Sequence, residues 1–192
     1  MLEIIQLTIL FIVLFDPLAS LAVFFIGTKN LKNSERKKVA LYAVLLAGLL
    51  SYTCLLFGDS LLTLLNTNLD NIRIAGGIIL IILGIRMSFG YSLFNKGINK
   101  NDSVHSIAAL IATPLLTGPA VITAIIVLKN DFGFFSPAIS ILITLMIAYL
   151  LFYNSEKIFK IFNETTIQVI STFLGLITIA WGVGFLRVAI GF

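Results

Sequence analysis

Apolar stretches long enough to cross a lipid bilayer follow one another along nearly the whole chain. About 20 predominantly apolar residues span ~30 Å of hydrocarbon as a helix. Lipid offers the backbone no hydrogen bonds, so such segments must be helical. With 59% hydrophobic and 11% charged residues, the sequence predicts an all-α integral membrane protein, one transmembrane domain over residues 1–192. The six segments are residues 4–27, 37–58, 72–92, 104–128, 134–154 and 166–190.

The first apolar segment, Ile4 to Ile26, carries Asp16-Pro17 at its middle. At ~1.5 Å per helical residue, Asp16 falls near the bilayer midplane. An unpaired acid there costs ~2.5–3.5 kcal/mol even on the lower scales, so it normally faces the protein interior or a wet cavity. Asp as N-cap followed by Pro is also how a helix begins. We expect two half-helices that meet at mid-membrane.

The fourth segment is interrupted in a similar way. Pro114, Gly118 and Pro119 lie within a few residues of one another at its middle. They should break the helix and free backbone groups that lipid cannot satisfy. Thr117-Gly118 ahead of Pro119 predicts a helix restart, with Thr113 ahead of Pro114 as an alternative start. A proline-kinked helix without any site is the competing interpretation.

The two halves of the chain correspond. A shift of about 97 residues brings Asp16-Pro17-Leu18 onto Thr113-Pro114-Leu115, and Ser20 onto Thr117. Each half, about 1–94 and 103–192, then holds three segments. Because three is odd, the second half enters the membrane from the opposite side. The expected fold is six transmembrane helices in two inverted three-helix repeats, with spans one and four broken at mid-membrane.

Glycines strengthen this correspondence. A shift of about 98 residues places Gly77 and Gly84 of the third segment on Gly175 and Gly182 of the sixth. Small residues at such spacing allow helix backbones to approach closely, so we expect them to serve packing rather than ligand binding.

The distribution of lysine and arginine predicts the orientation. Ten of the 13 lie between segments one and two, three and four, or five and six, and only Arg73, Lys129 and Arg187 fall on the other side. The basic loops should therefore be cytoplasmic and both termini outside, in the cell membrane. The net charge of +4 does not point to nucleic acid in such a chain. A single Cys54 excludes an internal disulfide and a thiolate metal cluster, and we expect no metal and no cofactor.

Two half-helices that begin at the midplane suggest a binding site. Helix N-termini carry partial positive charge and free N–H groups suited to a carboxylate. Asp16 supplies a partner for an ammonium group, a sodium ion or a proton. The helix N-termini and the Asp16 carboxylate together therefore suit a zwitterion. The candidate substrate- and ion-binding residues are Asp16, Pro17, Ser20, Thr113, Pro114, Thr117, Gly118, Pro119 and Thr123.

The same motifs resemble a known family. Phe15 to Ala19, Pro114 to Thr123, and Ile74 to Ile78 with Gly84 are similar to the signatures of the MarC/SnatA family of small six-span membrane proteins. The resemblance covers essentially the whole chain and implies an inner-membrane transporter of small neutral amino acids such as glycine and alanine. Asp16 stands where the family usually has Asn, which opens a cation or proton-coupled variant. Ala19 and Ala120 stand where it often has Gly.

We therefore expect a secondary transporter of small neutral amino acids, ion- or proton-coupled through Asp16, and not an enzyme. Its partners would be the lipid bilayer and the amino acid, with a second copy of the chain as a further possible partner. The sequence does not distinguish proton from sodium coupling, or import from export. The alternatives are an exporter of a cation or metabolite, a membrane scaffold without flux, or an intramembrane enzyme. The last lacks a second midplane carboxylate, a His pair and a Ser–His arrangement.

Overall fold

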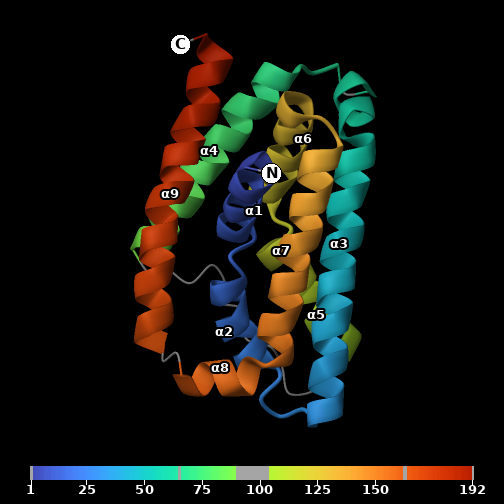
Figure 1. Cartoon of the computed structure of the whole chain (residues 1–192), viewed down its shortest axis with the longest axis vertical. Helices are drawn as coiled ribbons and strands as arrows, with labels where there is room; N and C mark the ends of the chain where they lie inside the picture. The colour runs from blue at the N-terminus through green and yellow to red at the C-terminus, as the bar shows by residue number, and fades with distance from the viewer. Residues whose placement is uncertain (1, 65, 90–103, 162–163, 192) are drawn as a thin grey trace.

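The computed structural model describes residues 2–64, 66–89, 104–161 and 164–191. Within these ranges the chain is helical and forms no strand. The helices make an elongated bundle in which most axes run along its length, and α8 lies across one end (Figure 1). The elements are α1 (Leu2–Phe15), α2 (Pro17–Gly27), α3 (Asn33–Leu64), α4 (Leu69–Ser88), α5 (Val104–Leu110), the π-helix η1 (Ile111–Leu116), α6 (Pro119–Phe132), α7 (Phe135–Tyr153), α8 (Ser155–Ile161) and α9 (Glu164–Ile190).

Four helices are long and apolar enough to cross a membrane: α3, α4, α7 and the part of α9 from Gln168 to Ile190. The pair α1 and α2, bent by 43° between them, is a candidate for a fifth span. The expected fourth span is divided among α5, η1 and α6, so the count of six stays a prediction. The all-α class is confirmed. The short helix α8 was not expected, and α3 extends beyond its predicted span at both ends.

Aromatic side chains fill the centre of the bundle where α1, α2 and α7 meet. Phe11, Phe15, Phe24 and Phe152 are fully buried. The rings of Phe24 and Phe152 are stacked, with centroids 4.9 Å apart and 3° between their planes. The outward faces are also apolar, as a surface in contact with lipid should be. They include Leu49, Met146, Leu150, Phe173 and Leu176.

Glycines set the packing of α4 against α9, which lie side by side and antiparallel (Figure 1). A Cβ placed on Gly84 would lie 2.5 Å from the Gly175 carbonyl oxygen, and one on Gly77 would lie 2.7 Å from that of Gly182. Contacts this short leave room for hydrogen only, so backbone meets backbone along the pair. The expected packing role of these four glycines is confirmed.

The contacts between α4 and α9 follow the correspondence between the two halves of the chain, in which residues about 98 positions apart are equivalent. Replacing each residue by its counterpart turns the pair Gly77–Gly182 into the pair Gly175–Gly84, and both pairs are present. A two-fold axis between the two helices would produce this relation. The side-chain neighbours obey it as well: Ile81 lies beside Gly182 and Ile179 beside Gly84, while Leu186 lies beside Gly77 and Ser88 beside Gly175.

Gly84→Ala should destabilise the protein, because the added methyl group would meet the Gly175 carbonyl. Overpacking of this kind costs about 1–3 kcal/mol. The matched control is Gly184→Ala in α9, where an added Cβ has no neighbour within 4 Å and alanine's better helix propensity should leave Tm equal or slightly higher. Thermal unfolding of the detergent-solubilised protein measures both. Equal Tm values for the two variants would contradict the close packing of α4 on α9.

Candidate functional site

Asp16 both ends one helix and begins the next. Its N–H donates to the Ile12 carbonyl at 3.1 Å, as the last residue of α1 would. Its backbone then takes the left-handed conformation, φ 39° and ψ 62°, and its Oδ1 accepts the Ala19 N–H at 3.2 Å. Asp tolerates this conformation better than most residues because its short polar side chain bonds locally. The predicted helix break, with Asp16 as N-cap and Pro17 at the first helical position, is confirmed.

The second break is spread over more residues. Thr113 leaves helical geometry, with φ −117° and ψ 118°, and the Thr117 N–H donates to the Ala112 carbonyl at 3.0 Å across a wide π-type turn. Gly118 is then the extended N-cap residue, and α6 begins at Pro119. The predicted restart at Pro119 is confirmed. The side chain of Pro114, another predicted site residue, lies outside the described part of the structure.

The two breaks lie next to each other near the middle of the bundle. In Figure 1, α2 runs from its break toward the end that carries α8, and α6 runs from its break toward the opposite end. Both α1 and α2 pack on η1, and α1 also packs on α6. Two helix N-termini therefore approach the same region from opposite directions.

The N-terminus of α6 has no side-chain cap and is only partly buried, since Gly118 is half-buried and Pro119 is exposed. Ala120 and Val121 in its first turn are buried, and no side chain accepts a hydrogen bond from this end of the helix. Thr117, directly before it, is 2% exposed, and its hydroxyl has no hydrogen-bond partner in the described part of the chain. A buried donor left unpaired costs about 1–3 kcal/mol. This place is therefore suited to an anionic group that would accept these hydrogen bonds.

The other predicted site residues differ in their surroundings. Ser20 is buried one turn after Asp16. The Thr113 hydroxyl is exposed and donates to the Ala109 carbonyl at 2.9 Å. Thr123 donates to the Pro119 carbonyl at 2.8 Å and contacts Gly76 of α4. The hydroxyls of Thr113 and Thr123 are thus used within their own helices, whereas that of Thr117 is not.

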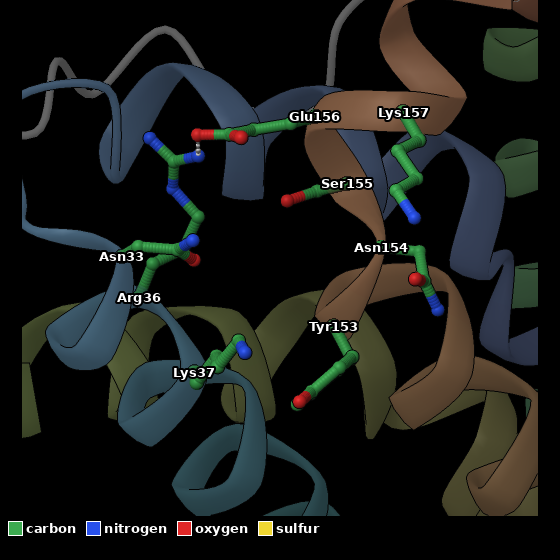
Figure 2. Close-up of a pocket in the computed structure, with 8 residues that line it drawn as sticks. All are labelled: Asn33, Arg36, Lys37, Tyr153, Asn154, Ser155, Glu156 and Lys157. Atoms are coloured by element: carbon green, nitrogen blue, oxygen red, sulfur yellow. Dashed lines mark hydrogen bonds and ion pairs between the residues drawn. The ribbon is translucent and has the colours of Figure 1, made fainter.

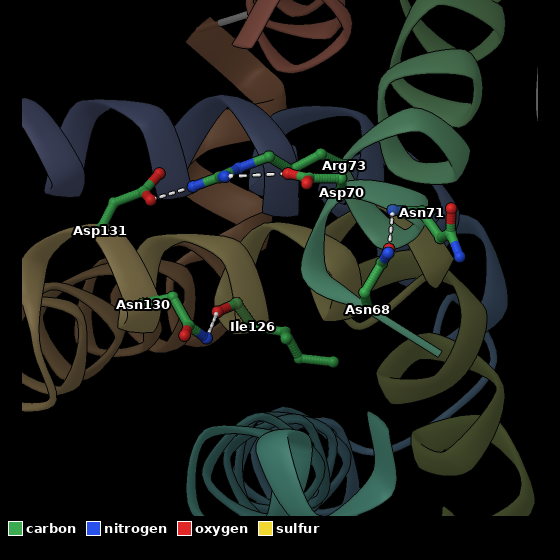
Figure 3. A network of polar contacts seen from close by, with 7 residues as sticks. All are labelled: Asn68, Asp70, Asn71, Arg73, Ile126, Asn130 and Asp131. Atoms are coloured by element: carbon green, nitrogen blue, oxygen red, sulfur yellow. Dashed lines mark hydrogen bonds and ion pairs between the residues drawn. The ribbon is translucent and has the colours of Figure 1, made fainter. Parts of the chain in front are cut away.

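Ion pairs hold α6 to its neighbours at one end of the bundle. Lys129 of α6 pairs with Asp59 of α3, with Nζ to Oδ2 at 2.6 Å, and the Asn130 side chain donates to the same carboxylate at 2.9 Å. Arg73 of α4 pairs with Asp131 of α6 and, at 3.5 Å, with Asp70 (Figure 3).

The opposite end, which we call the basic end, carries lysine and arginine residues on α3, on α8 and between α2 and α3, among them Lys29, Lys32, Arg36, Lys37, Lys38 and Lys157. Here Arg36 of α3 pairs with Glu156 of α8 (Figure 2). It also donates to the Thr28 carbonyl after α2, at 3.2 Å. One guanidinium therefore ties α2, α3 and α8 together.

Sequence reasoning missed the pairing of these charges because it used them only to orient the chain. A signal was available: Glu156 lies about 97 residues after Asp59, the shift that relates the two halves. Both acids form an inter-helix ion pair, one at each end of the bundle.

A family model for MarC family integral membrane proteins matches residues 1–191 of the chain. The chain belongs to the MarC family. The expected family membership is confirmed, and with it the assignment as an integral membrane protein.

Other members of the MarC family are similar over most of their length. A UPF0056 membrane protein of Buchnera aphidicola subsp. Schizaphis graminum is 29% identical over 92% of this chain and 90% of its own. A UPF0056 membrane protein of Methanocaldococcus jannaschii is 31% identical over 86% and 84%. The UPF0056 membrane protein YhcE of Escherichia coli is 28% identical over 90% and 85%. No solved structure matches the chain at a significant level.

The local chemistry of the first break predicts different effects for two neutral substitutions at Asp16. Asp16→Asn keeps an acceptor for the Ala19 N–H and tolerates φ 39°, so Tm should be retained. Asp16→Val removes the cap and forces a β-branched residue into the left-handed region, which together should cost roughly 2–3 kcal/mol. Both variants remove the charge, so the difference between their Tm values in thermal unfolding reports the effect of the cap and of the backbone conformation at residue 16. A Val variant as stable as the Asn variant would contradict this account.

Proposed function

We propose that this MarC protein is a secondary transporter that binds a small neutral amino acid at the two helix breaks and couples its movement to a proton or a sodium ion through Asp16. The observation that carries the proposal is the uncapped N-terminus of α6 together with the buried, unpartnered Thr117 hydroxyl directly before it, next to the break at Asp16. Broken helices whose N-termini meet inside the bundle are typical of secondary transporters.

The two breaks offer opposite partners to a zwitterion. The α6 N-terminus and the Thr117 hydroxyl would receive the carboxylate, because both present unpaired donors. Asp16 uses Oδ1 for the Ala19 N–H, which leaves acceptor capacity on its carboxylate for an ammonium group or a coupling ion. Ser20 lies one turn after Asp16 and would supply a further hydroxyl.

The surroundings favour a small apolar side chain on the amino acid. Ala112, Leu116 and Ala120 flank the second break and are buried. Such a lining offers no partner for a charged or strongly polar side chain, and burying one there would be unfavourable. Glycine and alanine are the substrates that fit best.

An inverted repeat would give this site two equivalent exits. The exchange of contacts between α4 and α9 supports a pseudo-two-fold axis. The acids Asp59 and Glu156 support it as well, since they occupy corresponding positions at opposite ends and each pairs with a basic residue of another helix. In the six-span arrangement that follows, the basic end would be cytoplasmic and both termini outside. The two ion pairs would then act as latches that close one exit at a time.

Uptake into liposomes tests the transport proposal. The purified protein should take up labelled glycine or alanine saturably when a proton or sodium gradient is imposed. Asp16→Asn should retain binding but lose the response to the gradient, because the amide keeps the cap and cannot hold a proton or compensate an ion's charge. Thr117→Val should lower the affinity about tenfold, since it removes a hydrogen bond to a charged group.

Thr113→Val is the control, because the Thr113 hydroxyl already donates to the Ala109 carbonyl and its loss should leave uptake unchanged. Absence of uptake of either amino acid by a monodisperse, cooperatively unfolding protein would refute the amino-acid proposal. Gradient-driven flux of a small cation in the same liposomes would assign the midplane site to a cation exporter.

The latch pairs predict opposite shifts in access to the site. The probe is a single cysteine introduced by Ser20→Cys in a Cys54→Ala background. Asp59→Asn removes the ion pair with Lys129, and it should raise the reactivity of this cysteine toward a membrane-impermeant thiol reagent added outside. Glu156→Gln should raise it from the cytoplasmic side. Partly exposed ion pairs contribute about 0.2–1 kcal/mol, so the changes should be up to about fivefold. Both variants raising reactivity from the same side would contradict the latch assignment.

A further inference from the structure

A cavity of about 150 Å³ opens at the basic end of the bundle. Its walls come from the first residues of α3 and from the junction of α7 with α8 (Figure 2). This volume holds several water molecules, or one phosphate group. The lining residues that carry the argument are Arg36, Lys37, Tyr153, Ser155, Glu156 and Lys157.

Two buried polar groups in this cavity have no partner. Arg36 is 7% exposed; one terminal nitrogen pairs with Glu156 and the other donates to the Thr28 carbonyl at 3.2 Å, but its Nε has no acceptor in the described part of the chain. The Ser155 hydroxyl, on a residue 1% exposed, has no hydrogen-bond partner there either. Arg36 and Ser155 approach the cavity from facing walls (Figure 2). Both offer donors, and a buried donor without an acceptor is unfavourable.

The cavity also has an excess of positive charge. Arg36, Lys37 and Lys157 line it, and Glu156 is the one carboxylate among its lining residues. Lys37 lies over the Tyr153 ring, 4.4 Å from its centroid, which orders the ammonium group without neutralising it. Arg36 and Lys37 sit near the N-terminus of α3, where the helix dipole disfavours cations. An anionic ligand would relieve both the repulsion and the unpaired donors.

We propose that this cavity binds a phosphate group. Arginine and lysine side chains donate hydrogen bonds and accept none, so the ligand must bring several acceptor oxygens arranged around one centre. Phosphate does so with a charge that complements the excess of cations, and hydrogen bonds from charged donors to its oxygens are strong. The group belongs either to an anionic phospholipid headgroup or to a small soluble phosphate. The inference does not depend on the proposed transport site, because neither Asp16 nor Thr117 lines the cavity.

Calorimetric titration of the purified full chain in detergent tests the site with two probes, inorganic phosphate and a short-chain phosphatidylglycerol. Lys37→Gln should weaken binding about tenfold through loss of a charge-assisted hydrogen bond. Ser155→Ala should weaken it about threefold to tenfold. Lys38→Gln is the matched control: it removes the same charge from the next residue, which is exposed and outside the cavity, and should change the affinity less than twofold.

Binding of inorganic phosphate with this pattern of variants establishes the site for a soluble phosphate. Binding of phosphatidylglycerol alone, with the same pattern, establishes it for a lipid headgroup. The proposal is overturned if the folded protein binds neither probe, or if Lys37→Gln and Lys38→Gln weaken binding equally. Ser155→Ala removes a single hydroxyl, so it keeps the test decisive should the lysine variant fold poorly.

Discussion

Lipid cannot hydrogen-bond to the backbone, and the rest of this structure depends on how the chain meets that constraint where its helices break. At the first break Asp16 meets it alone, since its backbone ends α1 and its side chain caps α2. At the second break Gly118 has no side chain to cap α6, and the Thr117 hydroxyl has no partner. One break is complete within the protein and the other is not. The incomplete break is therefore the one at which the proposed function puts the carboxylate of the ligand.

The parts of the bundle differ in how firmly they are joined. α4 and α9 meet backbone to backbone through four glycines, and no side chain is available there to adjust. At the two ends, by contrast, ion pairs at the protein surface join α6 and α8 to α3, Lys129 with Asp59 and Glu156 with Arg36. Such pairs contribute little individually and exchange readily with water. A movement that opens one end would separate these pairs and leave the α4–α9 contact intact.

Much of the fold followed from local chemistry that a sequence displays. Asp16-Pro17 specifies a helix start because the cap and the proline act on neighbouring residues, and the glycine spacing specifies a close helix contact. Two features were not predictable in this way. The second break extends over several residues, from Thr113 to Gly118, because the π-type turn closes on Ala112. The basic-end cavity joins residues 33–37 with residues 153–157, and no local pattern indicates which distant segments meet.

The helix break alone does not explain why residue 16 is a charged aspartate. An asparagine would cap α2 with the same geometry and tolerate the same backbone conformation. A carboxylate in the apolar part of a membrane costs ~2.5–3.5 kcal/mol, whereas the net gain from its single hydrogen bond to the Ala19 N–H is about 1.5–3 kcal/mol at most. Capping by the amide avoids the larger part of this cost. The fold therefore accounts for a polar cap at residue 16 and leaves the negative charge to the cationic partner that the proposed function gives it.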